Sequence, residues 1–311
     1  MMTFRNALKI FMMFLIFTAY TQEQSSEQQS GPETLNNPLS ELIAPGAEVV
    51  QLATGFKFTE GPAVDAEGNI FFTDQPNNRI HKWSIDGQIS LFHESPQRAN
   101  GLYFASDGKL LACADLHSRL IAIDKSGTIE VLVDHYQQKR LNGPNDLWPD
   151  PKGGIYFTDP YYQRNYWERT TSEQDGEHVY YLTPDRQQLL RVADDLVQPN
   201  GIIGTPDGTK LYVADIRAGK TYAFQIHQDG TLRNKQLFAP EGSDGMTIDK
   251  NGNVYLTNKA VSVFDSRGNK IGEIQVPERP SNVCFGGKNR TTLFITARTS
   301  LYAIEMQVPG I

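Results

Sequence analysis

One kind of residue recurs along the chain: an oxygen-bearing polar side chain placed where a short apolar segment begins. It occurs at intervals of 38 to 55 residues, a range typical of propellers and other repeat arrays. The six occurrences are Glu60 in EGPAV, Asn100 in NGLYF, Asn145 in NDLWP, Asn200 in NGIIG, Asp244 in DGMTI and Asn282 in NVCFG. Equivalent positions in a closed ring of repeats face one axis, so we expect these oxygens to converge there.

Converging carboxylate and amide oxygens suit a hard divalent cation. The metal ligands that we predict are Glu60, Asn145, Asn200 and Asp244, which together supply two negative charges. Ca²⁺ takes about 6–8 oxygen ligands, so positions stay open for water or substrate. The six histidines show no metal-ligand spacing, which disfavours zinc, although oxygen ligands also accept Mn²⁺ or Zn²⁺.

A second interpretation of these residues is purely structural, because Asn before Gly is common in turns. Any one of the six fits that interpretation. Turn chemistry does not call for a charged residue at the inward start of a core strand, however, and six residues in register favour the metal ring.

The segments between these residues indicate the elements that position them. Each polar residue starts a short apolar strand, an Asp/Gly turn follows, and a β-branched or aromatic strand comes next, as in VDAEGNIFFTD (64–74) and TIDKNGNVYLTN (247–258). Two further strands complete each repeat, and four strands in about 40–45 residues is the pattern of a propeller blade. We therefore predict an all-β, six-bladed β-propeller with four-stranded antiparallel blades around a central metal site, with little helix between residues 46 and 306.

Two segments depart from the repeat. The third repeat carries an aromatic and charged insertion, YYQRNYWERTTSEQDGEH (161–178), between its second and third strands. VVQLATGF (49–56) precedes the first blade and is predicted to be the outer strand of the last blade, which closes the ring and removes its open edges.

The N-terminus predicts export. Arg5 and Lys9 precede an apolar run at 10–17, which indicates a signal peptide over residues 1–21, with an uncleaved membrane anchor as the alternative. Residues 22–45 are polar and predicted to be a flexible linker, and residues 46–311 the catalytic propeller domain. The location expected is periplasmic or secreted, with no membrane contact beyond the N-terminal segment.

Composition and missing motifs exclude several classes of function. The net charge of −7 and the lack of a basic patch argue against a nucleic-acid partner. No GxSxG motif is present, so a nucleophilic triad has little support. Cys113 and Cys284 fall in blades that are not neighbours, and we predict two free, buried thiols. The sequence does not indicate the oligomeric state.

At this level of detail the chain resembles the SMP-30/gluconolactonase/LRE-like family of calcium-dependent six-bladed propellers. The resemblance covers about residues 46–306, and its KRLNGPND block is most similar to bacterial gluconolactonases. Four segments carry it: TEGPAVDAEGNIFFTD (59–74), KRLNGPNDLWPDPKGGIYFTDPYY (139–162), QPNGIIGTPDGTKLYVAD (198–215) and GSDGMTIDKNGNVYLT (242–257).

The resemblance implies roles for individual residues. The family's calcium ligands fall on Glu60, Asn145, Asn200 and Asp244, and its general base on Asp244. A sugar-contacting acidic residue of the family has its nearest match in Asp159. A substrate-binding Arg of the family falls on Gly143, so Arg140 is the displaced candidate for that role.

The remaining polar and aromatic residues are assigned as follows. Asn100 is expected to contact substrate or a metal-bound water, and Asn282 to be structural. An aromatic roof is expected from the insertion, with Tyr161 as the substrate-binding candidate beside Tyr162, Tyr166 and Trp167. The residues expected to be hydrogen-bond acceptors at strand ends are Asp74, Asp115 and Asp215.

The function these observations favour is that of a calcium-dependent hydrolase which opens a sugar lactone, with a small-molecule lactone as its partner. The cation polarises the carbonyl, and Asp244 or a bound water handles the proton of the attacking water. Two alternatives use the same fold: an ester or phosphotriester hydrolase with the same metal site, and a propeller that binds a ligand without turnover.

Overall fold

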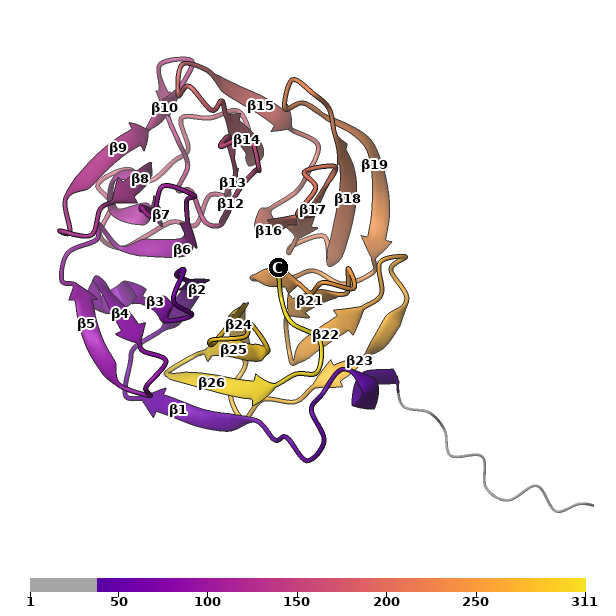
Figure 1. The fold of residues 1–311 in the computed structure, drawn as a ribbon. Coiled ribbons are helices and arrows are strands. Elements are labelled where there is room, and N and C mark those ends of the chain that lie inside the picture. Colours follow the sequence, from indigo (N-terminus) through magenta and orange to yellow (C-terminus); the bar gives the residue numbers. More distant parts are fainter. Residues whose placement is uncertain (1–37) are drawn as a thin grey trace, which may run out of the picture. The chain divides into compact units, whose positions relative to one another are not determined.

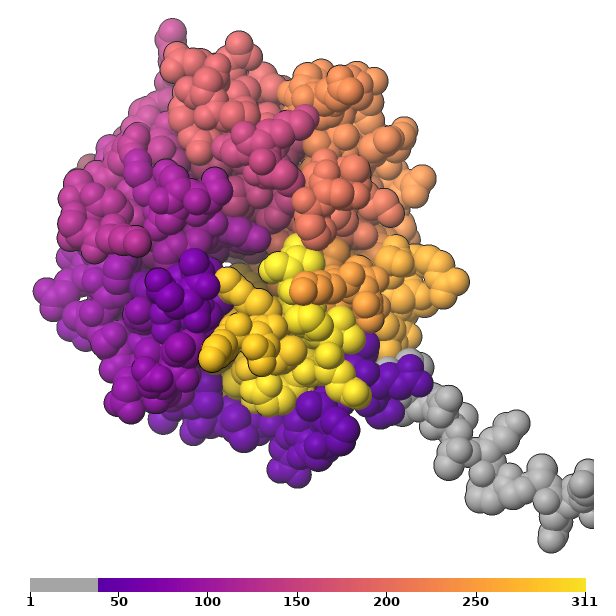
Figure 2. Space-filling model, viewed as in Figure 1, coloured from indigo at the N-terminus to yellow at the C-terminus, as the bar shows by residue number. Residues whose placement is uncertain are grey.

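The propeller predicted from the repeat is the fold of the chain. The computed structural model describes residues 38–311, and the signal-peptide prediction for residues 1–21 lies outside them. Six four-stranded antiparallel sheets stand around an axis in chain order, as the colour gradient of Figure 1 shows. The space-filling view leaves a hollow at the centre of this ring, near the chain end (Figure 2).

Each blade runs from an inner strand at the axis to an outer strand at the circumference. Blade 1 consists of β2 (Thr59–Val64), β3 (Ile70–Asp74), β4 (Arg79–Trp83) and β5 (Ile89–His93). Blade 2 consists of β6 (Ala99–Phe104), β7 (Leu110–Ala114), β8 (Arg119–Ile123) and β9 (Ile129–Val133). Blade 3 consists of β12 (Leu147–Pro149), β13 (Ile155–Asp159), β14 (His178–Leu182) and β15 (Leu189–Ala193).

The second half of the ring repeats this arrangement. Blade 4 consists of β16 (Pro199–Gly204), β17 (Lys210–Asp215), β18 (Lys220–Ile226) and β19 (Leu232–Ala239). Blade 5 consists of β20 (Met246–Ile248), β21 (Val254–Thr257), β22 (Val261–Phe264) and β23 (Lys270–Ile274). Blade 6 consists of β24 (Pro280–Gly286), β25 (Thr292–Ala297), β26 (Ser300–Glu305) and β1 (Val50–Thr54).

The ring closes without a covalent link. Strand β1 pairs antiparallel with β26, with Val50 opposite Ala303 and Thr54 opposite Ser300. This confirms the prediction that the segment 49–56 supplies the last blade's outer strand. A strand from the start of the domain thus covers the edge that the end of the domain leaves open.

The domain begins earlier than the sequence predicted. Residues 38–45 were assigned to the flexible linker, but Pro38–Glu41 form a 3-10 helix (η1) and Ile43 bridges Met306. Leu39 and Leu42 are buried in a cluster with side chains of blades 5 and 6. Their burial outweighs the ordering cost that the polar composition of the stretch suggested.

The insertion lies where it was predicted, because β13 ends at Asp159 and β14 begins at His178. An additional hairpin, β10 (His135–Tyr136) with β11 (Lys139–Arg140), separates blades 2 and 3 and was not foreseen. Helix is limited in residues 38–311 to η1, η2 (Gln75–Asn77) and η3 (Asp115–His117). None of the helices in this part of the chain has the length and apolarity to cross a membrane.

The turns between the first and second strands of blades 1, 3 and 5 have a shared local cause. The Asp that starts the turn accepts backbone amides two and four residues ahead, at 2.8–3.0 Å, as Asp65 does from Glu67 and Asn69 and Asp249 does from Asn251 and Asn253. This Asx-type bonding fixes the hairpin before the strands pair.

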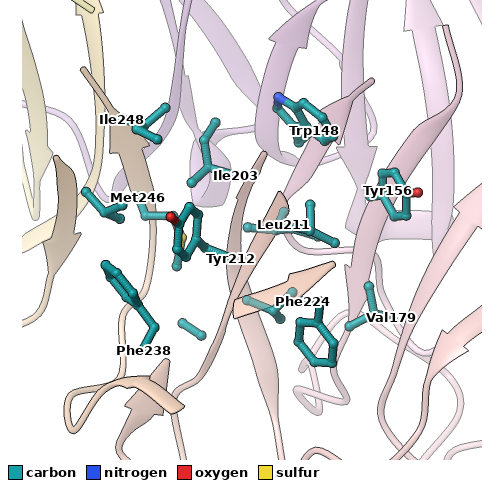
Figure 3. Packing of buried hydrophobic residues seen from close by; sticks show 14 of the residues in the cluster. Trp148, Tyr156, Val179, Ile203, Leu211, Tyr212, Phe224, Phe238, Met246 and Ile248 are labelled. Atoms are coloured by element: carbon teal, nitrogen blue, oxygen red, sulfur yellow. The ribbon is translucent and has the colours of Figure 1, made fainter. Parts of the chain in front are cut away.

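Apolar side chains fill the space between adjacent blades. In the largest cluster, Trp148 and Tyr156 of blade 3 lie beside Leu211 and Tyr212 of blade 4, and Met246 of blade 5 continues the layer (Figure 3). Cys113 and Cys284 are buried free thiols in other clusters, as predicted. Each blade therefore buries both its faces against its neighbours, which fixes the inner strands around the axis.

Buried hydroxyl groups link the blades close to the axis. Thr73 of blade 1 donates to the Asn100 carbonyl of blade 2 (3.1 Å), and Thr158 of blade 3 donates to the Asn200 carbonyl of blade 4 (2.7 Å). Thr257 of blade 5 repeats the contact with Ser281 of blade 6 (2.7 Å). Two of the carbonyls held in this way belong to residues of the predicted metal ring.

Candidate functional site

The six repeated polar residues lie at the axial ends of the inner strands. Glu60, Asn100, Asn200 and Asn282 are each the second or third residue of β2, β6, β16 and β24, while Asn145 and Asp244 stand two residues before β12 and β20. Five of them line one cavity of about 280 Å³: Glu60, Asn100, Asn145, Asn200 and Asp244. The sixth, Asn282, is buried beside it and donates to Glu60 Oε2 at 3.2 Å.

Glycines bring these residues together. A Cβ on Gly61 would lie 2.1 Å from the Asn100 carbonyl oxygen, and one on Gly201 would lie 2.9 Å from the Asp244 carbonyl oxygen. A Cβ on Gly245 would meet the Asn282 side chain at 2.0 Å or less. Because only hydrogen fits at these positions, the inner strands approach closely enough for their side chains to share one cavity.

Asp146 takes the place that glycine has after four of the other five ring residues. Its Oδ1 accepts the Leu147 amide at 3.0 Å, and the side chain lies against Gly101, where a Cβ would be 2.5 Å from that oxygen. Burial raises the pKa of Asp146 to about 8. It is a third acidic side chain near the axis, and sequence analysis missed it although its departure from the Asn–Gly pattern was visible.

The two ring carboxylates are destabilised in their charged form. Burial raises the pKa of Glu60 well above its usual range, and the negative charge of Asp244 raises it further. Burial raises the pKa of Asp244 to about 6, although hydrogen bonding by Asn200 and the charge of Arg279 oppose the rise. Two like charges held this close in a buried cavity favour a cation between them.

An unpartnered oxygen supports the same conclusion. Asn200 is 1% exposed, and its Nδ2 donates to the Tyr162 hydroxyl at 2.9 Å. Its Oδ1 is buried without a hydrogen-bond partner. Buried polar atoms are rarely left unsatisfied, so this oxygen is free to serve a ligand. The donors at hand, two carboxylates and the amide oxygens of Asn145 and Asn200, fit a hard divalent cation.

The site does not resemble a cluster of the usual soft or mixed ligands. Within residues 38–311, no group of three or more His, Cys, Asp or Glu side chains is arranged to hold a metal. The donor set predicted from the sequence therefore depends on the amide oxygens of Asn145 and Asn200 as well as on two carboxylates.

The insertion covers part of the cavity. Tyr162 and Arg164 line it, so the expected aromatic roof is present in Tyr162. Asp115 of blade 2 fixes the loop, because its Oδ2 accepts from Arg164 Nε and from the Tyr166 hydroxyl, both at 2.6 Å. Trp167 donates to the Asp115 carbonyl at 2.9 Å. Asp115 thus anchors the roof, which is more specific than the strand-end role expected of it.

Three predicted substrate-binding residues are not brought to the cavity. Asp159 is fully buried, Arg140 is exposed on the β10–β11 hairpin, and Tyr161 donates to Gln163 within the insertion. The geometry does not support substrate contact by any of them. Arg140 is exposed because it lies on this hairpin, which the sequence did not reveal.

Asp159 instead belongs to a structural set with Asp74 and Asp215. Each of these Asp residues is the last residue of its blade's second strand. Its carboxylate accepts hydrogen bonds of 2.8–3.2 Å from two backbone amides, which belong to the residues three and two positions before the ring residue of the same blade. The amide pairs are Lys57 and Phe58, Asn142 and Gly143, and Val197 and Gln198. These bonds hold the segments that lead into the cavity, and the shared register of the three Asp residues was the signal that could have revealed this role.

Sequence analysis also missed most of the cavity's cationic and neutral wall. The lining residues it did not foresee are Phe58, Gln75, Arg164, Ile216, Arg279, Pro280, Ser281 and Arg298. Several of them lie in blade 6, whose segment FGGKNRTTLFITAR (285–298) lacks the Asp/Gly turn of the repeat, and no equivalent residue in other blades indicates their role.

The fold and the ring of polar oxygens at its axis define the class of this protein as a six-bladed propeller with a polar axial cavity. Comparison with known protein families and structures leads to the same class. Residues 58–299 match the model of the SMP-30/Gluconolactonase/LRE-like region. A gluconolactonase of Zymomonas mobilis is 31% identical over 88% of this chain and 85% of its own length. The chain belongs to the SMP-30/gluconolactonase/LRE-like family.

Solved structures agree with this assignment. A gluconolactonase from Xanthomonas campestris is 30% identical, with a TM-score of 0.81 over 86% of this chain and 92% of that chain. Regucalcin from Agrobacterium tumefaciens, described as a calcium-binding protein, is 20% identical with a TM-score of 0.72, over 86% of this chain and 96% of that chain. The second likeness concerns the fold alone.

We predict that Ca²⁺ stabilises the protein more at about pH 7.5 than at about pH 5, since protons compete for the ring carboxylates. Their raised pKa values mean that the metal-free protein loses stability as pH rises through about 6 for Asp244, and a bound cation offsets this loss. The measurement is the midpoint of thermal unfolding with and without Ca²⁺ at both pH values. An equal shift at the two pH values would contradict the assignment of these ligands.

We predict that Asp159→Asn destabilises the fold by about 1–3 kcal/mol, because an amide cannot accept from both the Asn142 and Gly143 backbone groups. Urea unfolding measures the loss, and Asp185→Asn is the matched control on an exposed turn. The KM for a lactone should stay unchanged. A raised KM with unchanged stability would restore Asp159 as a substrate-binding residue.

Proposed function

We propose that this protein is a Ca²⁺-dependent hydrolase that opens the ring of a sugar lactone. The observation that carries the proposal is the pairing of two destabilised carboxylates, Glu60 and Asp244, with the unpartnered Asn200 Oδ1 in one cavity. The Zymomonas gluconolactonase, similar over most of both chains, supports the choice of a lactone as substrate.

The cavity suits a small polar substrate. Its volume of about 280 Å³ is at the small end for ligand pockets, which supports a single sugar ring. Side chains that form hydrogen bonds outnumber apolar ones in its wall, where Phe58, Ile216 and Pro280 are the purely apolar residues. Such a wall matches the hydroxyl groups of a sugar lactone better than a long acyl chain.

The residues that would hold the cation are Glu60, Asn145, Asn200 and Asp244. A divalent cation at this place supplies a Lewis acid that draws electron density from the lactone carbonyl. Asn100 lines the same cavity without belonging to the donor set, and its proposed role is to orient the substrate or a water. Tyr162 orients Asn200 through its hydroxyl and excludes bulk water from one side.

Asp244 is the side chain we propose as the proton acceptor. Water adds to the carbonyl carbon and gives one proton to this carboxylate. The ring C–O bond then breaks, and Asp244 returns that proton to the ring oxygen, which leaves as a hydroxyl. The product is the open hydroxy acid. A cation nearby lowers the pKa of Asp244, so its proton transfer contributes less to the rate than stabilisation of the carbonyl oxygen does.

The test is hydrolysis of glucono-1,5-lactone by the purified protein, followed by acid release with a pH indicator. We expect turnover above the spontaneous rate that EDTA abolishes and added Ca²⁺ restores. Turnover that EDTA leaves intact would contradict metal dependence. An absence of turnover with bound metal, or faster turnover of esters or phosphotriesters, would overturn the lactonase proposal.

We predict that Asp244→Asn lowers kcat by about 10²–10⁴-fold, the usual contribution of a positioned acid–base group. Asp185→Asn, on an exposed turn, is the control and should keep normal turnover. Calorimetric titration with Ca²⁺ then separates lost metal binding from lost proton transfer. Near-normal kcat in the variant would remove Asp244 as the base.

A further inference from the structure

The wall of the cavity carries positively charged side chains that the predicted metal site does not require. Three arginines line it, namely Arg164, Arg279 and Arg298, in a chain whose net charge is −7. They come from unrelated segments: the insertion of blade 3, the residue before β24, and the turn between β25 and β26. The carboxylates that line the cavity are Glu60 and Asp244.

One of the three arginines already has a partner. Arg164 forms a salt bridge with Asp115, with Nε 2.6 Å from Oδ2, and the Asp115 carboxylate is almost fully buried. This pair is neutral as a unit, and it explains Arg164 as part of the anchor for the roof. Arg164 therefore leaves no unbalanced charge in the cavity.

The other two arginines pair with no carboxylate. Arg279 donates from Nε to the Asn258 carbonyl (3.1 Å) and from Nη2 to Asn258 Oδ1 (3.3 Å), which are neutral acceptors. The guanidinium of Arg298 lies 6.0 Å from the centre of the Phe58 ring. Neither residue forms a salt bridge within the described part of the chain, and both side chains are exposed at the cavity.

Their positions are held by the backbone. Arg279 directly precedes β24, and its contacts with Asn258 tie it to blade 5. Arg298 has a left-handed backbone (φ 46°), an unusual state for a residue other than glycine, and its carbonyl accepts the Thr59 amide at 2.8 Å. Blade 6 thus presents two guanidinium groups beside the cavity from fixed backbone positions.

Charge balance then indicates what the two groups are for. With a divalent cation bound, the charges of Glu60 and Asp244 are neutralised, and the two unpaired guanidinium groups remain. Their planar forks match the geometry of carboxylate and phosphate groups, with which they form strong charge-assisted hydrogen bonds. A cavity of about 280 Å³ leaves room for one sugar ring with one such substituent.

We propose that the natural substrate is an anionic sugar lactone, with a carboxylate or phosphate group away from the lactone ester, and that Arg279 and Arg298 are specificity-determining residues which bind that group. This inference rests on the proposed lactonase function and specifies its substrate class. Neutral glucono-1,5-lactone would then be a poorer substrate that uses the ring but not the two arginines.

The test compares three lactones at saturating Ca²⁺: neutral glucono-1,5-lactone, 6-phosphoglucono-1,5-lactone and glucaro-1,4-lactone. We expect kcat/KM for at least one anionic lactone to exceed that for the neutral one by about tenfold or more. The double variant Arg279→Gln/Arg298→Gln should lose about tenfold or more on that lactone and less than about twofold on the neutral one. The preferred anionic lactone distinguishes phosphate from carboxylate.

The control is Arg267→Gln, which removes one exposed positive charge that pairs with Asp265 outside the cavity. It should leave all three substrates unaffected. Turnover of the neutral lactone by the double variant also shows that the variant is folded. At about 1 M salt, where charge interactions are screened beyond about 3 Å, the unmodified protein should also lose its preference for the anionic lactone over the neutral one, as the double variant does.

Two results would overturn the proposal. One is equal or faster turnover of the neutral lactone by the unmodified protein, which leaves the lactonase function intact. The other is an equal loss on neutral and anionic lactones in the double variant, which would mean that the arginines act on the ring or the reacting carbonyl.

If no lactone is hydrolysed, the lactonase proposal fails and binding decides the inference about the arginines. Calorimetry with 6-phosphogluconate, glucarate and gluconate measures it, in the unmodified protein and in the double variant. Tighter binding of 6-phosphogluconate or glucarate than of gluconate, lost in the double variant, supports anion recognition by Arg279 and Arg298. Equal binding of all three, or none, overturns it.

Discussion

The close approach of the inner strands at the axis is the constraint on which the rest of the structure depends. Side chains from blades 1 to 5 share one small cavity because Gly61, Gly201 and Gly245 leave no Cβ between neighbouring strands. An alanine at any of these positions would collide with the backbone or side chain of the next blade. If the blades moved apart, the ring residues would no longer share one cavity. The same contacts between inner strands therefore determine both the packing of the blades and the geometry of the site at the axis.

The cavity is costly for the fold in the absence of a cation. Glu60 and Asp244 are buried like charges, and Asn200 keeps an unsatisfied oxygen. The surrounding structure offsets this cost with contacts that do not involve the ring side chains: the Thr158 hydroxyl on the Asn200 carbonyl, and the pairing of β1 with β26. A scaffold closed by strand pairing and interblade packing can hold such a site open, where a smaller or less constrained fold would relax to pair these groups.

The sequence predicted what repetition makes visible. The blades and the ring of polar residues follow from a local pattern that recurs along the chain. A repeat whose own sequence is ambiguous can therefore be assigned from the clearer repeats, and the closing strand follows from the number of strands that a blade needs. The resemblance suggested Asp159 as a substrate-binding residue, whereas its register with Asp74 and Asp215 indicates an acceptor for backbone amides. Residues that act once, such as Leu39 in its cluster or Asp146 near the axis, have no copies, and their roles depend on contacts that only the folded chain reveals.

The same distinction separates two parts of the site. The ring that suits a cation comes from equivalent positions of successive blades, and symmetry brings its members to the axis. The groups that face the rest of a substrate come from places where the symmetry is broken: Tyr162 in the insertion, and Arg279 and Arg298 in the least regular blade. Residues at equivalent positions of the repeats form the ring at the axis. Residues at positions where a blade departs from the repeat form the wall, and they can differ without disturbing the ring, which changes the substrates that the cavity accepts. The substrate preference of this protein should therefore be sought in the insertion and in blade 6, where a substitution alters the wall of the cavity and leaves the inner strands in place.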